Sequence, residues 1–151
     1  MSLNEHFTAT ITVDRTPEEV VAAIADVRGW WSEDVIGETA ELGDEFVFMD
    51  AGIRFCRFRL TEVEPARRVV WHVVDAFLGF IEDHDEWTGT DAIFEITPTA
   101  TGTSLRFTHR GLMTTSACYS ACSKGWSYYI HESLPMLLET GSGRPIPRAA
   151  G

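Results

Sequence analysis

Apolar and polar side chains alternate near the start of the chain, as they do in a strand with one buried face. The alternation runs from Phe7 to Val13, and it predicts a strand over residues 6–13. Directly after it, Thr16-Pro17-Glu18-Glu19 has the composition of a helix start: a capping residue, a proline at the first helical position and acidic residues in the first turn. Apolar residues then recur at helical spacing up to Val27, which predicts a helix that ends at Gly29, just before Trp30-Trp31.

The segment from about residue 35 to residue 111 consists of β-rich runs separated by short turn sequences rich in Gly, Pro and Asp. Short links without an intervening helix are typical of an antiparallel meander. The expected strands are Glu45–Met49, Arg54–Val63, Val69–Ala76, Ala92–Thr97 and Ser104–His109.

A second helical pattern closes the chain, over residues 115–139. Its apolar residues fall on one face, and Pro135 should kink it because proline has no N–H to donate and clashes with the preceding turn. Gly141-Ser142-Gly143 should end it. We therefore expect one domain over residues 1–141 and a flexible C-terminal tail over residues 142–151.

The composition excludes several classes of partner. The chain has 151 residues, 44% of them hydrophobic, and its 12 basic and 23 acidic residues give a net charge of −11. Nucleic acids and anionic membranes attract basic surfaces, so neither is an expected partner. No apolar run is long enough to cross a bilayer, the first residues lack the pattern of a signal peptide, and three cysteines suit a reducing compartment. We expect a cytoplasmic protein.

Several short sequences resemble a known family in their order along the chain. They are Asp14–Val20, the Pro-centred hairpin Glu62–Trp71, the strand Gly102–His109 and the pair Gly125-Trp126. Together they resemble the START-like helix-grip superfamily, also called SRPBCC, and within it the branch related to activators of the heat-shock-chaperone ATPase. The resemblance implies an α+β fold, in which a curved antiparallel sheet of six to seven strands wraps around a long C-terminal helix, with short helices after the first strand. It also implies an apolar cavity between the sheet and the helix.

Aromatic residues are the expected lining of that cavity, although strand alternation alone cannot distinguish a lined cavity from a solid core. Trp30 and Trp31 cannot both point inward if their segment is regular, so one packs on the sheet while the other lies at the cavity mouth or staples the helix end. The candidate cavity residues are Trp30, Trp31, Phe46, Phe48, Phe58, Trp71, Trp87, Phe94, Phe107, His109, Trp126 and Tyr129.

His109 is the one candidate catalytic residue. It shares a strand face with Leu105 and Phe107, so it should point inward with them. An imidazole in an apolar cavity could orient a ligand or act as a general base, while the simpler alternative is a histidine that bonds a neighbouring backbone or hydroxyl group. The candidate assistants of a base are Asp50, Asp91, Glu95 and Tyr128.

Other clusters are better explained without a ligand. The acidic run from Glu82 to Glu86 lacks the glycine and the spacing of a calcium loop and should be a solvated hairpin tip. Cys118 and Cys122 lie four apart on the closing helix, but no second metal-binding motif accompanies them. One expected strand carries Arg54, Arg57 and Arg59. An arginine that pointed inward could bind a carboxylate, whereas an arginine that pointed outward would be solvated. No metal and no cofactor is expected.

These observations favour a protein that holds a small apolar or aromatic ligand in an internal cavity. A cyclase-, aromatase- or hydrolase-like enzyme that uses the same cavity is the alternative, and a co-chaperone-like interaction module is a further one. The activators themselves carry an additional chaperone-binding domain, for which this chain has no room. If Trp30 or Trp31 were exposed, a homodimer would be favoured.

Overall fold

In the computed structural model, residues 6–50, 54–79, 81–82 and 84–146 are described, apart from the side chains of Asp50 and Arg54. The strands are β1 (His6–Val13), β2 (Val35–Gly37), β3 (Glu45–Asp50), β4 (Arg54–Glu64), β5 (Arg68–Leu78), β6 (Asp91–Pro98) and β7 (Thr103–Met113). The helical elements are α1 (Pro17–Ala25), α2 (Val27–Trp30), α3 (Tyr119–Tyr128), the π-helical turn η1 (Tyr129–Ser133) and α4 (Leu134–Thr140).

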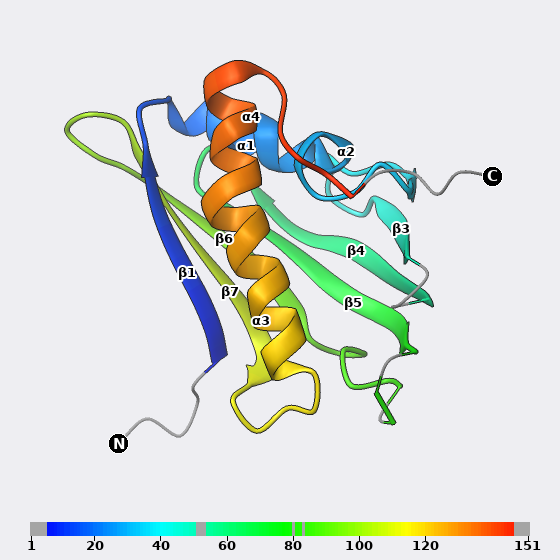
Figure 1. Cartoon of the computed structure of the whole chain (residues 1–151). Coiled ribbons are helices and arrows are strands. Elements are labelled where there is room, and N and C mark those ends of the chain that lie inside the picture. The colour runs from blue at the N-terminus through cyan, green and yellow to red at the C-terminus, as the bar shows by residue number, and fades with distance from the viewer. Residues whose placement is uncertain (1–5, 51–53, 80, 83, 147–151) are drawn as a thin grey trace.

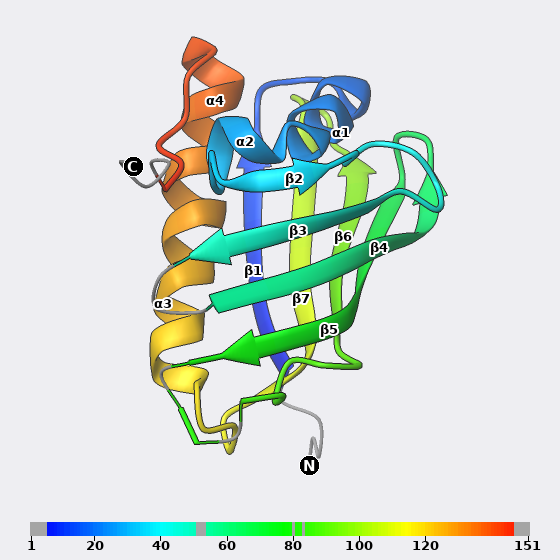
Figure 2. The ribbon, with the colours of Figure 1, turned by 90° about the vertical axis from the view of Figure 1, so that its right-hand side faces the viewer.

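The strands form one antiparallel sheet in the order β1-β7-β6-β5-β4-β3-β2, which confirms the predicted α+β meander. The pairing of β4 with β5 shifts at Arg57/Phe58 and again at Leu60/Glu62, and bulges of this kind bend a sheet. The sheet is so strongly curved that β3, β4 and β5 cross the direction of β1, β6 and β7 (Figure 2). The C-terminal helical elements lie across its concave face (Figure 1). Strand β2 was not predicted, because three residues carry too little alternation to be recognised.

The helix after β1 starts as predicted but ends earlier. The Thr16 hydroxyl accepts a hydrogen bond from the backbone N–H of Glu19, and the Glu19 carboxylate accepts one from the backbone N–H of Thr16, 3.1 and 2.9 Å long. This capping box fixes the first turn. The predicted end at Gly29 is wrong, because α1 stops at Asp26 and Gly29 lies inside α2. A Cβ on Gly29 would lie 2.4 Å from an Asp26 carboxylate oxygen, so a larger residue there would require the exposed Asp26 side chain to move.

The closing helix begins at Tyr119 and not at residue 115, because Met113 and Ser116 form a hydrogen-bonded turn before it. The predicted irregularity near Pro135 takes the form of the π-helical turn η1, immediately before α4. Pro135 lies in the first turn of α4, where its missing N–H costs little. Gly141 ends the helix in a left-handed conformation, with φ of 85°, as its position in the sequence predicts.

Ser133 joins three segments at the end of η1. Its hydroxyl is fully buried, donates to the carbonyl oxygen of Trp30 at 2.6 Å and accepts from the backbone N–H of Arg144 at 2.7 Å. Beyond α4, residues 141–146 run back along α2, where Ile146 exchanges hydrogen bonds with Trp31 and Glu33. These residues belong to the segment expected to be a tail, whose remainder, residues 147–151, lies outside the described residues.

Replacing Ser133 with alanine should lower the free energy of unfolding by about 1–2 kcal/mol, because the buried Trp30 carbonyl and the Arg144 N–H would both lose their partner. Urea denaturation measures the change. Ser120→Ala, at an exposed position of α3, is the control and should change stability by less than about 0.5 kcal/mol. Equal losses in the two variants would contradict the bridging role.

Candidate functional site

A layer of fully buried aromatic rings fills the space between the concave face of the sheet and α2. Trp71 lies at its centre, with ring centroids 6.1 Å from Trp30, 5.1 Å from Phe46, 5.6 Å from Phe58 and 4.7 Å from Phe94. All five side chains are at most 1% exposed. The Nε1–H of Trp71 is a buried donor that has no hydrogen-bond partner within the described part of the chain.

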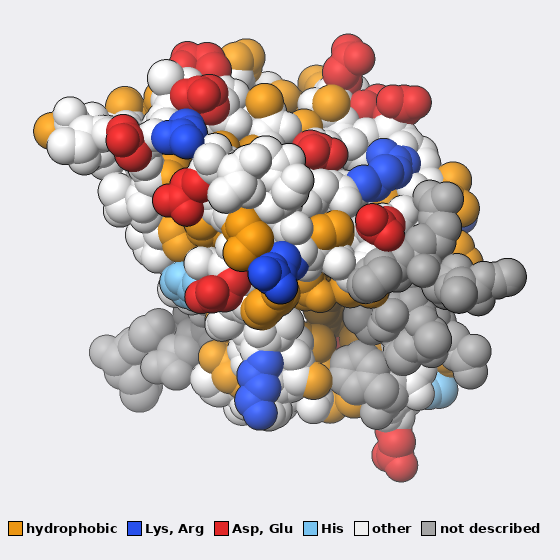
Figure 3. Space-filling view, turned by 45° about the horizontal axis from the view of Figure 1, so that its top comes forward, with side chains coloured by type: hydrophobic (Ala, Val, Ile, Leu, Met, Phe, Trp, Pro, Cys, Tyr) orange, Lys and Arg blue, Asp and Glu red, His pale blue; other side chains and the backbone are white. Residues whose placement is uncertain are grey.

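Three other tryptophans form a row along the edge of this layer, and we call Trp31, Trp126 and Trp87 the tryptophan row. The rings of Trp31 and Trp126 are 5.1 Å apart, and those of Trp126 and Trp87 are 6.0 Å apart and nearly parallel, at 11°. They keep 4%, 3% and 4% of their surface accessible. Figure 3 shows hydrophobic side chains at the bottom of a hollow beside the C-terminal helix. The row therefore combines near-complete burial with residual access.

The buried cysteines lie at the same end of the interior. The Sγ atom of Cys118 accepts a hydrogen bond from the Nε1–H of Trp87 at 3.2 Å. A hydrogen bond with Cys122, together with burial, raises the pKa of the Cys118 thiol, and burial raises the pKa of the Cys56 thiol. Cys56 and Cys118 are therefore neutral thiols near neutral pH. Among the described residues, no group of three His, Cys, Asp or Glu side chains is arranged to hold a metal ion.

His109 points into the interior, as its strand face predicts, and both of its ring nitrogens are hydrogen-bonded. The Nε1–H of Trp126 donates to His109 Nδ1 at 3.0 Å. Because an indole nitrogen can only donate, Nδ1 carries no proton, and the remaining proton of the neutral ring lies on Nε2. Nε2 then donates to the Thr90 hydroxyl at 2.9 Å, and this hydroxyl donates to the carbonyl oxygen of Trp87 at 2.6 Å.

Burial lowers the pKa of His109 to about 3, against a smaller opposing effect of the Asp91 carboxylate. The imidazole is therefore neutral near pH 7 and is held between Trp126 and Thr90. This arrangement corresponds to the simpler alternative for His109, which is a histidine bonded to a neighbouring hydroxyl group. It also fixes the ring of Trp126, so His109 positions one member of the tryptophan row.

The candidate assistants of His109 lie elsewhere. Asp91 is on the outer face of the sheet, where it contacts His72 and Arg110. Burial raises the pKa of the Asp91 carboxyl, but hydrogen bonds from Arg110 and His72 outweigh burial and hold the pKa below its usual value. Glu95, also on the outer face, pairs with Arg68, and Tyr128 is exposed. The side chain of Asp50 lies outside the described residues.

The loop between β5 and β6 holds Glu86, whose role the sequence did not indicate, and Trp87. Glu86 belongs to the acidic run that we expected to be solvated, yet its carboxylate accepts hydrogen bonds from the backbone N–H groups of Ala117 and Cys118 at 2.7 and 3.0 Å. It therefore caps the N-terminus of α3. Trp87, a candidate cavity residue, lies in this loop and is buried. Glu82, His84 and Asp85 are exposed as expected, while residue 83 is outside the described part.

The other candidate residues are distributed as follows. Phe48 and Phe107 are fully buried and contact the row, at 4.4 Å from Trp31 and 4.4 Å from Trp126. Tyr129 is half-buried. Trp30 and Trp31 both point inward, contrary to the expectation that only one would. The segment is not a regular helix, because α1 ends before Asp26 and α2 ends at Trp30. Neither side chain is exposed, so an exposed tryptophan at these positions is not a reason to expect a homodimer.

The inward arginine considered for β4 is not found among the described side chains, since Arg57 is exposed and Arg59 pairs with Glu45 on the outer face. The side chain of Arg54 is not described.

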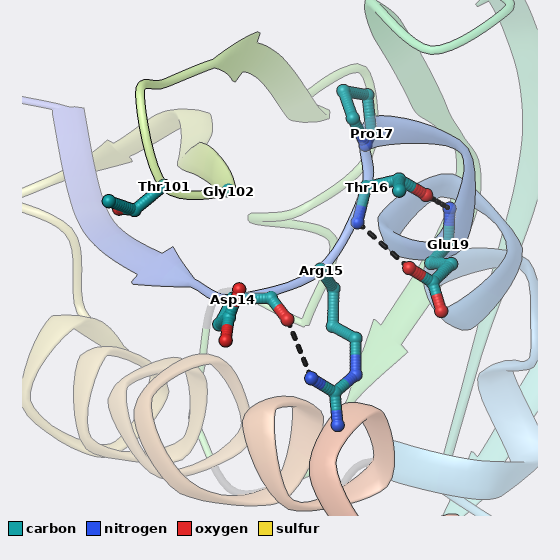
Figure 4. A pocket seen from close by; sticks show the side chains of 7 residues that line it. All are labelled: Asp14, Arg15, Thr16, Pro17, Glu19, Thr101 and Gly102. Atoms are coloured by element: carbon teal, nitrogen blue, oxygen red, sulfur yellow. Dashed lines mark hydrogen bonds between the residues drawn. The ribbon is translucent and has the colours of Figure 1, made fainter.

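A shallow depression of about 570 Å³ lies on the surface between the start of α1 and the β6–β7 turn (Figure 4). The side chains of Arg15, Thr16 and Glu19 in this depression already have intramolecular partners. The guanidinium of Arg15 donates to the carbonyl oxygens of Asp14 and Leu138 at 2.6 and 3.0 Å. Backbone and side-chain hydrogen bonds with Thr16 lower the pKa of Glu19. The depression thus includes the capped start of α1.

The chain is similar to known proteins in both sequence and fold. Residues 14–139 match a family model described as "Activator of Hsp90 ATPase homolog 1-like protein". Among solved structures, the chain is similar to the Aha1 dimer of Colwellia psychrerythraea, with 25% identity, a TM-score of 0.73, and 94% of this chain and 100% of that chain covered. No curated protein matches the chain.

Two further structures share the fold. The protein SSP2350 of Staphylococcus saprophyticus is 18% identical, with a TM-score of 0.69 over 93% of this chain and 97% of that one. CalU16 of Micromonospora echinospora is 16% identical, with a TM-score of 0.61 over 89% of this chain and 76% of that one.

Proposed function

The chain belongs to the family of Activator of Hsp90 ATPase homolog 1-like proteins, and on that premise we propose that it binds a small apolar or aromatic molecule against the tryptophan row. The observation that carries the proposal is the accessibility of this row. Trp31, Trp87 and Trp126 keep a few per cent of their surface open, next to an aromatic layer that is closed. A flat ligand that covered them would bury apolar area and stack on rings that are already ordered.

The polar groups nearby favour an uncharged ligand. The thiols of Cys118 and Cys56 have raised pKa values and are neutral, and His109 has a lowered pKa and is neutral as well. A buried charge without a partner costs several kcal/mol, so a charged ligand would be excluded from this end of the interior.

The hydrogen bonds of His109 support binding without chemistry. A general base needs a free lone pair within reach of the substrate, and both ring nitrogens of His109 already have protein partners. An enzyme should also bring a second titratable group to the same point, whereas Asp91 and Glu95 lie on the opposite face of the sheet. We therefore propose a binding protein and not an enzyme.

The proposed setting is the cytoplasm. In the described part of the chain, no helix is both long and apolar enough to span a bilayer. Free thiols at Cys56, Cys118 and Cys122 fit a reducing compartment.

A titration with the uncharged dye Nile red tests the proposal. We expect one saturable site and a blue-shifted emission. Cys122 lies between Cys118 and Trp126 on the buried face of α3, so Cys122→Leu should fill the space in front of the row and weaken dye binding by about tenfold or more. Ser120→Leu adds the same side chain on the exposed face of α3 and should leave dye affinity unchanged.

Equal affinities in the two leucine variants and the wild-type protein would place the dye elsewhere on the surface and overturn the proposal. Circular dichroism of both variants, compared with the wild-type protein, distinguishes a blocked site from a damaged fold.

A further inference from the structure

The outer face of the sheet is divided into a polar half and an apolar half. On β4 to β7, charged side chains of this face form ion pairs across the strands. Asp91 contacts both His72 and Arg110, and Arg68 contacts both Glu62 and Glu95. These charged groups are paired, and this half of the face is an ordinary solvated surface.

The other half carries large apolar side chains, and Figure 2 views the strands that bear them, β2 to β5, from this side. Ile36 on β2 is 64% exposed, Met49 on β3 is 41% exposed and Phe77 on β5 is 37% exposed. Strand pairing joins them into a continuous surface, because Ile36 lies opposite Val47, and Met49 lies opposite Phe55, which in turn lies opposite Phe77. We call these five residues the outer patch. The described structure exposes five large hydrophobic residues, and three of them, Ile36, Met49 and Phe77, belong to the outer patch.

An unpaired set of charges lies beside the outer patch. Arg57 on β4 and Asp75 on β5 lie directly opposite each other and both are exposed. Within the described residues neither forms an ion pair, in contrast to the networks on the polar half of the face. They are the next outward-facing pair along the same two strands after Phe55 and Phe77.

We propose that the outer patch is the interface of a homodimer. A two-fold axis that runs between β4 and β5, parallel to the strands and within the interface, exchanges the two strands. It sets Phe55 of one copy against Phe77 of the other, and Arg57 of one copy against Asp75 of the other. The surface is therefore complementary to itself, because apolar side chains face apolar side chains and each arginine faces an aspartate. An isologous contact requires such self-complementarity. The dimer covers exposed apolar area and completes both ion pairs.

The free edge of the sheet near the outer patch is closed to pairing. The Arg28 guanidinium donates to the carbonyl oxygens of Val35 and Gly37 on β2, at 3.0 and 2.9 Å. Edge strands present such carbonyls to other chains unless they are covered. Association on this side of the molecule therefore uses the face of the sheet, and the tryptophan row on the concave face stays free.

Sedimentation velocity over a concentration series tests the interface. The wild-type protein should shift from monomer to dimer with increasing concentration. Arg57→Glu and Asp75→Arg should each raise the dimer dissociation constant by about tenfold or more, because each puts like charges opposite one another. The double variant Arg57→Glu/Asp75→Arg restores opposite charges and should dimerise like the wild-type protein. Arg67→Glu, at an exposed position in the β4–β5 turn, is the control and should leave the dissociation constant unchanged.

A wild-type protein that stays monomeric at all concentrations overturns the proposal. So does a dimer that both single variants leave intact, or a double variant that fails to recover although circular dichroism shows it folded. Because Arg57 and Asp75 also lie opposite each other within one copy, the urea midpoint of each single variant is measured as well, and an unchanged midpoint assigns the loss of dimer to the interface.

Discussion

Lowering the pH from about 7 to about 5 should destabilise the wild-type protein by about 2 kcal/mol more than the His109→Gln variant. The reason is the buried imidazole. Its pKa is about 3 in the folded protein and near 6.5 when exposed. Between these values the unfolded chain binds a proton at His109 that the folded chain does not bind.

The sign follows from that difference. His109 has its folded pKa lowered, so the unfolded state binds more protons and stability falls as the pH decreases below about 6.5. The loss should approach about 1.4 kcal/mol per pH unit until the pH nears the folded pKa. A glutamine at position 109 keeps an acceptor for Trp126 and a donor for Thr90 but does not titrate, which removes this slope.

Urea denaturation at the two pH values measures the effect. His84→Gln is the control, because His84 is exposed and packs only against Phe77 among the described rings. Its pH dependence should equal that of the wild-type protein. An equally steep loss of stability in His109→Gln would mean that His109 is not the group that makes the fold sensitive to acid.

Trp126→Phe should lower the free energy of unfolding by about 1–3 kcal/mol more than Trp71→Phe. Both substitutions replace a nearly fully buried indole with a benzene ring and leave a similar void. They differ in the hydrogen bond. Loss of the Trp126 Nε1–H leaves His109 Nδ1 buried without a donor, whereas the Nε1–H of Trp71 has no partner to lose.

Equilibrium unfolding of the two variants under identical conditions provides the comparison. Equal losses would contradict the hydrogen-bond assignment at His109. The reverse order would mean that Trp71 has an acceptor in solution.

Much of the fold was predictable because its signals are local. Alternation over eight residues identifies β1, and Thr16-Pro17-Glu18-Glu19 identifies the start of α1. The break at Asp26 was not predictable, since the apolar spacing continues past it to Val27. The π-helical turn ends at Ser133, whose hydroxyl bridges Trp30 and Arg144 from distant parts of the chain, and such long-range contacts leave no local signal in the sequence.

The candidate site was predictable as a set of residues but not as an arrangement. Residue type and strand face predict that Phe107 and His109 point inward, and both do. Which rings close the core and which form the tryptophan row depends on curvature and on the loop that carries Trp87, and neither leaves a periodic signal.

The indole N–H signals of the tryptophans test the central claim most directly. The chain has five tryptophans, and in a nitrogen–proton correlation spectrum each gives one resolved indole signal that single Trp→Phe variants can assign. With naphthol as the probe, we expect saturable shifts at Trp31, Trp87 and Trp126, and much smaller ones at Trp30 and Trp71. Saturation without any shift at the tryptophan row, or no saturable shift at all, would contradict binding at this site.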